Sequence, residues 1–225
     1  MKKLFRATIV FTLLSLLLAC SQHPAARGPT NEQGLTTLTH SAFDKLAIRA
    51  NTDFSQYRQY KIETLTVSYD NTRRIDLLNR KKSVFEFDQR ELALFNKQFS
   101  KGLTNAWGKR FGWKLTEETG ADVIVVKATI TDMYLYASIK NNEVLPNTVF
   151  TNENSRMVIN LDLVDGQSGE LLLQSSGKKT TGLRRGTGIS AMTRNSSVRY
   201  WNDAFQAFRQ WGNLLAMEIE DMAGA

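Results

Sequence analysis

Apolar residues recur every three or four positions in two long segments of the sequence, the spacing that places them on one side of an α-helix. In residues 88–110 this stripe comprises Leu92, Phe95, Phe99, Leu103 and Trp107. In residues 198–222 it comprises Trp201, Ala204, Phe205, Phe208, Trp211, Leu215, Ile219 and Met222. Ser196 or Ser197 is placed to cap the start of the second segment. We therefore expect two amphipathic helices that each bury one face.

Other segments have the composition or the alternation of β-strands. They are residues 57–69, 113–116, 122–137, 156–164 and 170–179. The segment 122–137 begins with apolar residues on both sides, as expected of a central strand that a helix covers. The residues between the last two segments, Asp165-Gly166-Gln167-Ser168-Gly169, predict a hairpin turn.

The order of these elements is strand, helix, two strands, hairpin and helix. It predicts an α+β fold, a two-layer sandwich in which one mixed, mostly antiparallel sheet of about five strands carries both helices on one face. We assign residues 41–225 to this single domain, because about 200 residues suffice for one hydrophobic core.

The first residues have the build of a signal peptide. A short basic region precedes an apolar stretch at residues 7–19, which is shorter than the roughly 20 residues needed to span a bilayer. This stretch ends in Leu17-Leu18-Ala19-Cys20, which resembles the lipobox of bacterial lipoprotein precursors. The resemblance implies cleavage after residue 19, a diacylglyceryl group on Cys20 and an acyl chain such as palmitate on the new amino terminus.

Cysteine usage agrees with this interpretation. Cys20 is the only cysteine in the chain, so it cannot form an intramolecular disulfide. An ordinary secretory signal with an incidental cysteine is the alternative. Ser21 stands where the inner-membrane retention signal has Asp, so we expect the outer membrane, with the domain facing the periplasm. The polar residues 20–40 are predicted to form a flexible tether.

The net charge changes on maturation. Removal of residues 1–19 takes away Lys2, Lys3 and Arg6 and no acid, so the formal charge falls from +7 to +4. A mildly basic envelope protein gives no reason to expect a nucleic acid as partner.

Several features in sequence order resemble the domain-of-unknown-function family 3313 (DUF3313). They are Asp53-Phe54-Ser55-Gln56-Tyr57 before a strand, Gly120-Ala121-Asp122 before the central strand, the turn from Asp165 to Glu170, and Phe208 and Trp211 in a final helix. The resemblance covers residues 40–222. It implies a bacterial envelope lipoprotein of unassigned activity, and it provides no catalytic residue.

Histidine and metal chemistry find little support in the sequence. The two histidines, His23 and His40, lie in the predicted tether, where no rigid scaffold holds them. Asp162, Asp165 and Glu170 come nearest to a calcium site, but acids beside an exposed hairpin turn are usually solvated. We predict no catalytic residue, metal or cofactor.

Two segments are candidates for binding. The segment 182–199 carries Arg184, Arg185, Arg194 and Arg199 among glycines, a composition that suits phosphate or carboxylate groups. Its alternative interpretation is a solvated connection into the last helix. The segment 134–150 surrounds a polar turn with aromatic and aliphatic residues, and is either a partner surface or a strand extension that packs on its own domain.

The sequence thus favours a non-enzymatic binding or accessory module of the envelope. It would be membrane-bound through the lipid on Cys20 and would contact a periplasmic protein, peptidoglycan or lipopolysaccharide. Two alternatives remain: a sensor of anionic ligands that uses the four arginines, and a peptidoglycan hydrolase that uses two carboxylates. The candidate acids for the hydrolase are Glu86, Asp88, Glu91, Asp122 and Asp132.

Overall fold

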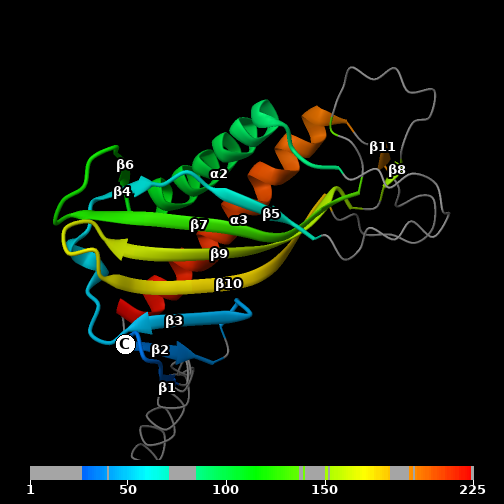
Figure 1. Ribbon diagram of the computed structural model, residues 1–225. Coiled ribbons are helices and arrows are strands. Elements are labelled where there is room, and N and C mark those ends of the chain that lie inside the picture. Colours follow the sequence, from blue (N-terminus) through cyan, green and yellow to red (C-terminus); the bar gives the residue numbers. More distant parts are fainter. Residues whose placement is uncertain are drawn as a thin grey trace, which may run out of the picture.

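The computed structural model of the chain describes residues 27–39, 41–70, 85–136, 139, 150–151, 153–182, 193–194 and 196–223. Within these ranges one large twisted sheet carries two long helices on one of its faces (Figure 1). The α+β class and the placement of both helices on one face are therefore confirmed.

Nine strands of the described chain form this sheet. They are β1 (Arg27–Thr30), β2 (Leu35–Leu38), β3 (Lys45–Arg49), β4 (Gln59–Ile62), β5 (Thr66–Tyr69), β6 (Lys114–Leu115), β7 (Val123–Leu135), β9 (Ser155–Asp165) and β10 (Leu171–Thr181). Their order is β1-β2-β3-β10-β9-β7-β4-β6, and β5 also pairs with β7. A separate pair joins β8 (Phe150–Thr151) to β11 (Thr193–Arg194).

The sheet is mixed, as predicted. The pairs from β1 through β2, β3, β10 and β9 to β7 are antiparallel. In contrast, β4 and β5 run parallel to β7, and β6 runs parallel to β4. The parallel connection between β4 and β7 contains the first long helix, as parallel pairs require a long crossover.

The predicted number of about five strands is wrong, because it missed β1, β2 and β3 and merged β4 with β5. The first three strands are only four or five residues long and show little alternation. The break after β4 is real, since the Leu65 amide there donates to Asn96 Oδ1 at 2.8 Å and not to a strand.

The predicted tether over residues 20–40 also needs correction. Residues 27–30 and 35–38 belong to β1 and β2 and pair within the sheet, so the folded domain begins before residue 41. Leu35 and Leu38 are buried there, which gives these short strands a reason to dock.

The two predicted helices are confirmed as α2 (Gln89–Arg110) and α3 (Ser197–Ala223). Asp88 caps α2 in a capping box with Glu91, which satisfies amides at the helix start. Ser196 Oγ accepts from the Arg199 amide at 3.4 Å at the start of α3. A short 3-10 helix, η2 (Phe54–Gln56), precedes β4. None of the described helices is long and apolar enough to cross a membrane.

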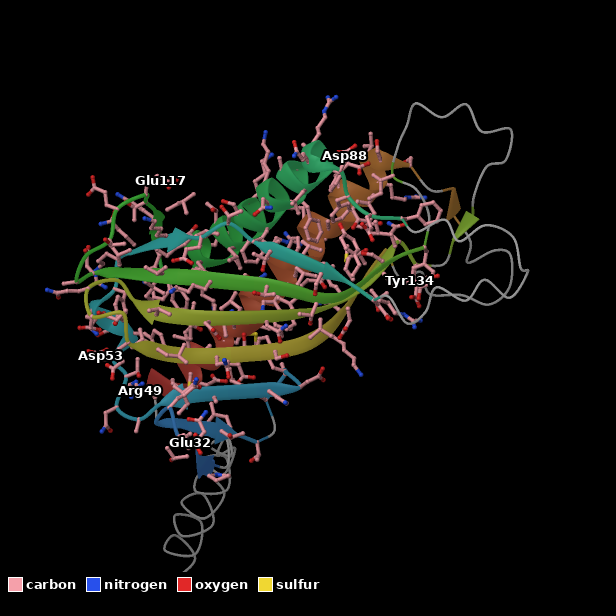
Figure 2. The ribbon with its side chains drawn as sticks, viewed as in Figure 1. Glu32, Arg49, Asp53, Asp88, Glu117 and Tyr134 are labelled. Carbon is pink, nitrogen blue, oxygen red and sulfur yellow. The ribbon has the colours of Figure 1, made fainter. Side chains whose placement is uncertain are left out.

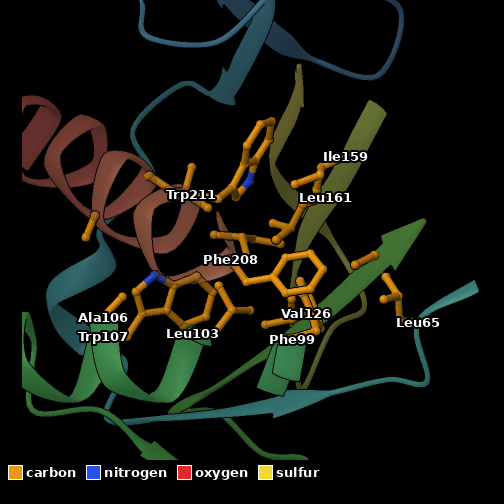
Figure 3. Close-up of a cluster of buried hydrophobic side chains, with 14 of the residues drawn as sticks. Leu65, Phe99, Leu103, Ala106, Trp107, Val126, Ile159, Leu161, Phe208 and Trp211 are labelled. Atoms are coloured by element: carbon orange, nitrogen blue, oxygen red, sulfur yellow. The ribbon is translucent and has the colours of Figure 1, made fainter. Parts of the chain in front are cut away.

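The core lies between the helices and the sheet, and Figure 3 shows part of it. Phe99 and Phe208 stack edge to face with ring centroids 5.1 Å apart, one from each helix. Trp107 Nε1 donates to the Gly212 carbonyl at 3.1 Å, so its polar atom is satisfied inside the core. Aromatic burial of this kind provides much of the stabilisation of a domain this size.

Candidate functional site

A polar cleft lies between the end of β10 and the first half of α3, which we call the β10–α3 cleft. Its volume is about 400 Å³. Both elements meet at the same end of the molecule (Figure 1). The lining residues are Lys179, Thr180, Thr181, Gly182, Asp203, Gln206, Ala207 and Gln210.

The cleft is elongated, and its two walls contact each other at both ends. At one end Lys179 Nζ donates to Gln210 Oε1 at 3.2 Å. At the other end Gly182 lies against Asp203. The strand wall advances three residues from Lys179 to Gly182, and the helix wall advances seven residues from Asp203 to Gln210. Both correspond to a length of roughly 10 Å.

Lys179 is the unusual residue of the cleft. Since alternate strand residues share a face, Lys179 is on the same side of β10 as the buried Leu173 and Ser175. A lysine therefore points toward the helix layer and is only partly exposed. Burial lowers the pKa of Lys179 from its ordinary value.

The ammonium group of Lys179 has few partners. Among the described residues, Gln210 Oε1 is its one hydrogen-bond acceptor, and no carboxylate pairs with it. An ammonium has three N–H donors, and a half-buried cation without a counter-charge loses hydration without compensation. The cleft is therefore suited to an anionic group at this end.

The opposite end carries negative charge and is held firmly. Asp203 Oδ2 accepts from Asn154 Nδ2 at 2.8 Å, and Asn154 is only 4% exposed. The backbone N–H of Asn154 donates to the Thr181 carbonyl at 2.8 Å, and the backbone carbonyl of Asn154 accepts from the Tyr136 N–H at 3.2 Å. Asn154 thus fixes Asp203 to the sheet through both its side chain and its backbone.

Buried hydroxyl groups lie behind this end of the cleft. Ser155 Oγ and Thr181 Oγ1 share a hydrogen bond of 2.7 Å, and the Tyr200 hydroxyl donates to Ser155 Oγ at 3.5 Å. Burial raises the pKa of Tyr200 well above its ordinary value, so it stays protonated and remains a donor. These groups satisfy one another, and they hold the hydroxyl of Thr181, which lines the cleft, in a hydrogen bond with Ser155.

The structure gathers part of the candidate hydrolase carboxylates near the start of α2 and separates Asp122 from them. Burial raises the pKa of Tyr69, and the nearby charges of Glu86 and Glu91 both add to that rise. Asp88 and Glu91 form the capping box of α2. Asp122 accepts from Gln59 Nε2 at 3.3 Å at the start of β7. Asp132 lies ten residues further along the same strand, which corresponds to roughly 30 Å. In Figure 2, Asp88 and Tyr134 lie at one end of the molecule and Asp53 lies at the other.

The three acids near the hairpin turn make separate contacts. Asp162 Oδ1 accepts from Gln174 Nε2 at 3.0 Å, and Glu170 Oε1 lies 3.2 Å from Arg49 Nη1. Asp165 Oδ1 accepts hydrogen bonds from Gln167 and Ser168 within the turn. Within the described ranges no three His, Cys, Asp or Glu residues are grouped so that they could hold a metal ion.

Several predicted residues lie outside the described part of the chain. They are Cys20, His23, His40, Arg184 and Arg185, and the side chain of Arg194. Arg199 is in the first turn of α3, one helical turn before Asp203. In the segment 134–150, Tyr134 and Tyr136 contact each other with ring centroids 4.9 Å apart, and most of the rest lies outside the described residues.

Sequence reasoning missed Lys179, although a signal for it exists. The hairpin strand alternates so that Leu173, Ser175 and Gly177 face one side, and Lys179 follows at the same parity. A lysine at an inward position is uncommon and marks a candidate site. The helix wall had a similar signal, because Asp203, Gln206 and Gln210 recur at helical spacing beside the apolar stripe.

Comparison with known proteins gives no family assignment. No protein-family model matches the chain, and no curated protein matches it. The resemblance to DUF3313 therefore stays a prediction.

Solved structures with a similar arrangement were found at low sequence identity. A PelC variant from Paraburkholderia phytofirmans, solved as a dodecamer, is 8% identical over 76% of this chain and 95% of its own, with a TM-score of 0.40. A candidate lipoprotein from Caulobacter crescentus is 11% identical over 76% and 93%, with a TM-score of 0.34. A Xanthomonas campestris protein of the family DUF330 is 8% identical over 75% and 90%, with a TM-score of 0.35. Values this low assign no activity to this chain.

Proposed function

We propose that this protein is a non-enzymatic, lipid-anchored envelope module that binds a small anionic ligand in the β10–α3 cleft. The observation that carries the proposal is the position of Lys179, a half-buried lysine that faces the helix layer with an amide as its acceptor. A ligand anion would supply a counter-charge that the described residues do not provide, and it would accept charge-assisted hydrogen bonds from Lys179.

Binding fits the cleft better than catalysis does. The hydroxyls of Ser155 and Thr181 are buried and hydrogen-bonded to each other, so neither is presented as a nucleophile. Hydrolysis of a glycan by two carboxylates needs them about 5 to 9.5 Å apart. Asp122 and Asp132, at opposite ends of β7, are much too distant for that chemistry. Asp88 and Glu91 do lie close together, but both are engaged in the capping box of α2.

The proposed location follows from the lipobox at Cys20 and from Ser21 after it. The acyl groups on Cys20 would insert into the inner leaflet of the outer membrane, and the cleft would face the periplasm. Since β1 begins at Arg27, the tether is shorter than the sequence pattern predicts. The domain would then stay close to the membrane and to the cell-wall layer beneath it.

Soluble peptidoglycan fragments provide a test of this proposal. The full-length chain in detergent is dialysed to equilibrium against an enzymatic digest of peptidoglycan, and the fragments on both sides are quantified by mass spectrometry. We expect enrichment of anionic fragments on the protein side, with the digest otherwise unchanged. Lys179→Met should abolish the enrichment, whereas Lys178→Met, on the opposite face of β10, should retain it.

The alternatives predict different results in the same experiment. A hydrolase would generate fragment masses absent from the digest, which would contradict the proposal. A sensor that works through Arg184, Arg185, Arg194 and Arg199 would lose enrichment when these four are replaced by alanine and keep it in Lys179→Met. Absence of any enrichment by the wild-type chain would also count against the cleft as a binding site.

A further inference from the structure

We infer that the ligand of the β10–α3 cleft is a short extended peptide of two or three residues, bound with its free carboxyl terminus on Lys179. This inference rests on the proposed function and specifies its ligand. Three properties of the cleft support it: the position of its cation, its length, and the hydrogen-bonding groups between its ends.

The cation selects a compact anion at one end. Lys179 Nζ is held by Gln210 at 3.2 Å, and two of its N–H donors remain for a ligand. Gln210 contributes its own amide N–H group beside the ammonium. A carboxylate has two oxygens that can accept from both groups at once.

The length of the cleft limits the size of the ligand. The distance from the Lys179 end to the Asp203 end is roughly 10 Å along either wall. An extended peptide spans about 3.3 to 3.6 Å per residue, so two or three residues fill this length. A single amino acid would leave half of the cleft to water, and a longer chain would pass beyond Gly182.

The middle and far end of the cleft match a peptide backbone. Gln206 lies between the two ends on the same face of α3, and its amide offers both a donor and an acceptor, as a peptide bond requires. Asp203 places a carboxylate where the amino terminus of such a peptide would lie, so the two ends of the cleft complement the two ends of a zwitterion.

The lining residues argue against a sugar acid as the ligand. They comprise threonines, a glycine, an alanine, two glutamines, a lysine and an aspartate. None has an aromatic ring on which a sugar face could stack, and aromatic rings are the usual apolar platform at such sites. The chemistry of the cleft therefore favours amide recognition.

Calorimetric titration of the full-length chain in detergent with defined peptides tests the inference. The probes are trialanine, its carboxyl-terminal amide, its N-acetyl derivative and N-acetylmuramic acid. We expect trialanine to bind and the amide to bind at least about tenfold more weakly, because one charge-assisted contact contributes about 1.5 to 3 kcal/mol. The N-acetyl derivative should lose affinity by a smaller factor, and N-acetylmuramic acid should show no binding.

Variants separate recognition by Lys179 from a loss of folding. Lys179→Met should weaken trialanine binding by about tenfold or more, Lys179→Arg should keep most of it, and Lys178→Met should match wild type. Thermal unfolding of each variant checks that the domain is intact. Equal binding of the acid and the amide, or unchanged binding by a folded Lys179→Met chain, would overturn the inference.

Failure of the inference and failure of the proposed function give different results. If peptidoglycan fragments are enriched in dialysis but no alanine peptide binds, the peptide assignment is wrong and the proposed function stands. If N-acetylmuramic acid binds in place of trialanine, the ligand is a sugar acid. If neither the fragments nor the peptides bind, both proposals fail.

Discussion

Gly182 meets two requirements at the rim of the cleft. Its backbone has φ +68°, which favours glycine, and a Cβ at this position would meet Asn154 Nδ2 and Asp203 Oδ2. Any larger residue would displace the asparagine that holds Asp203. The residue therefore connects backbone geometry directly to the shape of the candidate site.

Replacement of Gly182 can be compared with that of Gly169, which has φ +75° and nothing within 4 Å of the added Cβ. Gly169→Ala should cost about 1 kcal/mol through backbone strain alone. Gly182→Ala should cost at least about 1 kcal/mol more, because the Asn154 contact adds to the strain. Urea unfolding of both variants measures the difference. Equal losses of unfolding free energy would show that Asn154 moves aside without cost.

Asp165 gives the protein a pH-dependent contribution to stability. Burial by itself raises the pKa of Asp165, but the hydrogen bonds that its carboxylate accepts together outweigh burial, and two of them come from Ser168. The hydroxyl of the buried Tyr57 adds a further bond at 2.8 Å, and the pKa ends below its ordinary value. The ionised form is thus the one that the fold stabilises.

The sign of the effect follows from that lowered pKa. The stabilisation is complete above the unfolded pKa of about 3.9 and is lost as the pH falls through the lower folded value. At pH 7, Asp165→Asn should be less stable than wild type by about 1 to 2 kcal/mol. Urea unfolding at pH 7, 5 and 3 should show this gap narrowing at acid pH. A constant gap would contradict the assignment.

At the level of elements, the two helices approach each other through glycine. A Cβ on Gly102 would lie 2.7 Å from Phe208 Cβ and 2.9 Å from the Arg209 amide nitrogen. Gly108, two turns away on the exposed side of α2, has only the Trp113 carbonyl oxygen near its Cβ position, at 3.8 Å. The same residue type therefore has a packing role at one position and none at the other.

Alanine replacements in α2 should therefore have opposite signs. Gly102→Ala would push α3 away and should cost about 1 to 3 kcal/mol. Gly108→Ala should stabilise the chain by about 0.5 to 1 kcal/mol, because alanine is the better helix former and finds open space. Thermal unfolding of the two variants tests this. Destabilisation by both would mean that Gly108 has a contact beyond those described.

The elements that the sequence could predict are those with a strong period. α2 and α3 each repeat apolar residues over many turns, and β7, β9 and β10 alternate over eleven or thirteen residues. The strands β1 to β3 are too short to show a period, and their burial comes from the docking of β3 beside β10, of β2 beside β3 and of β1 beside β2. Such tertiary burial has no local signal in the sequence.

At the level of the whole molecule, the anchor is the feature with the most direct test. Cys20→Ser should abolish labelling by a radioactive fatty acid and move the protein from the membrane fraction to the soluble periplasm. Fractionation of cells that express both forms measures this. If the variant stays in the membrane fraction with the mass of wild type, the lipobox assignment is wrong.

The cleft illustrates why a site is harder to predict than a fold. The sequence predicts both the strand and the helix that form the walls of the cleft, but Lys179 and Gln210 are brought together only when α3 packs on β10. The four arginines form a cluster in the sequence, which favours residues 182–199 as a binding segment. The inward lysine just before that segment was a single residue, and its environment depended on contacts that no local pattern specifies.

The pairing of β3 with β10 has a consequence for how the chain folds as it emerges. Residues 45–48 pair with residues 173–176, so the first three strands have no place in the sheet until most of the chain has been made. During that interval β3 has no partner strand, and once β9 and β10 have formed their hairpin, β10 is an unprotected edge until β3 pairs with it. Docking of residues 27–49 is then a late, edge-sealing step, and mutations there should raise the unfolding rate more than they slow folding.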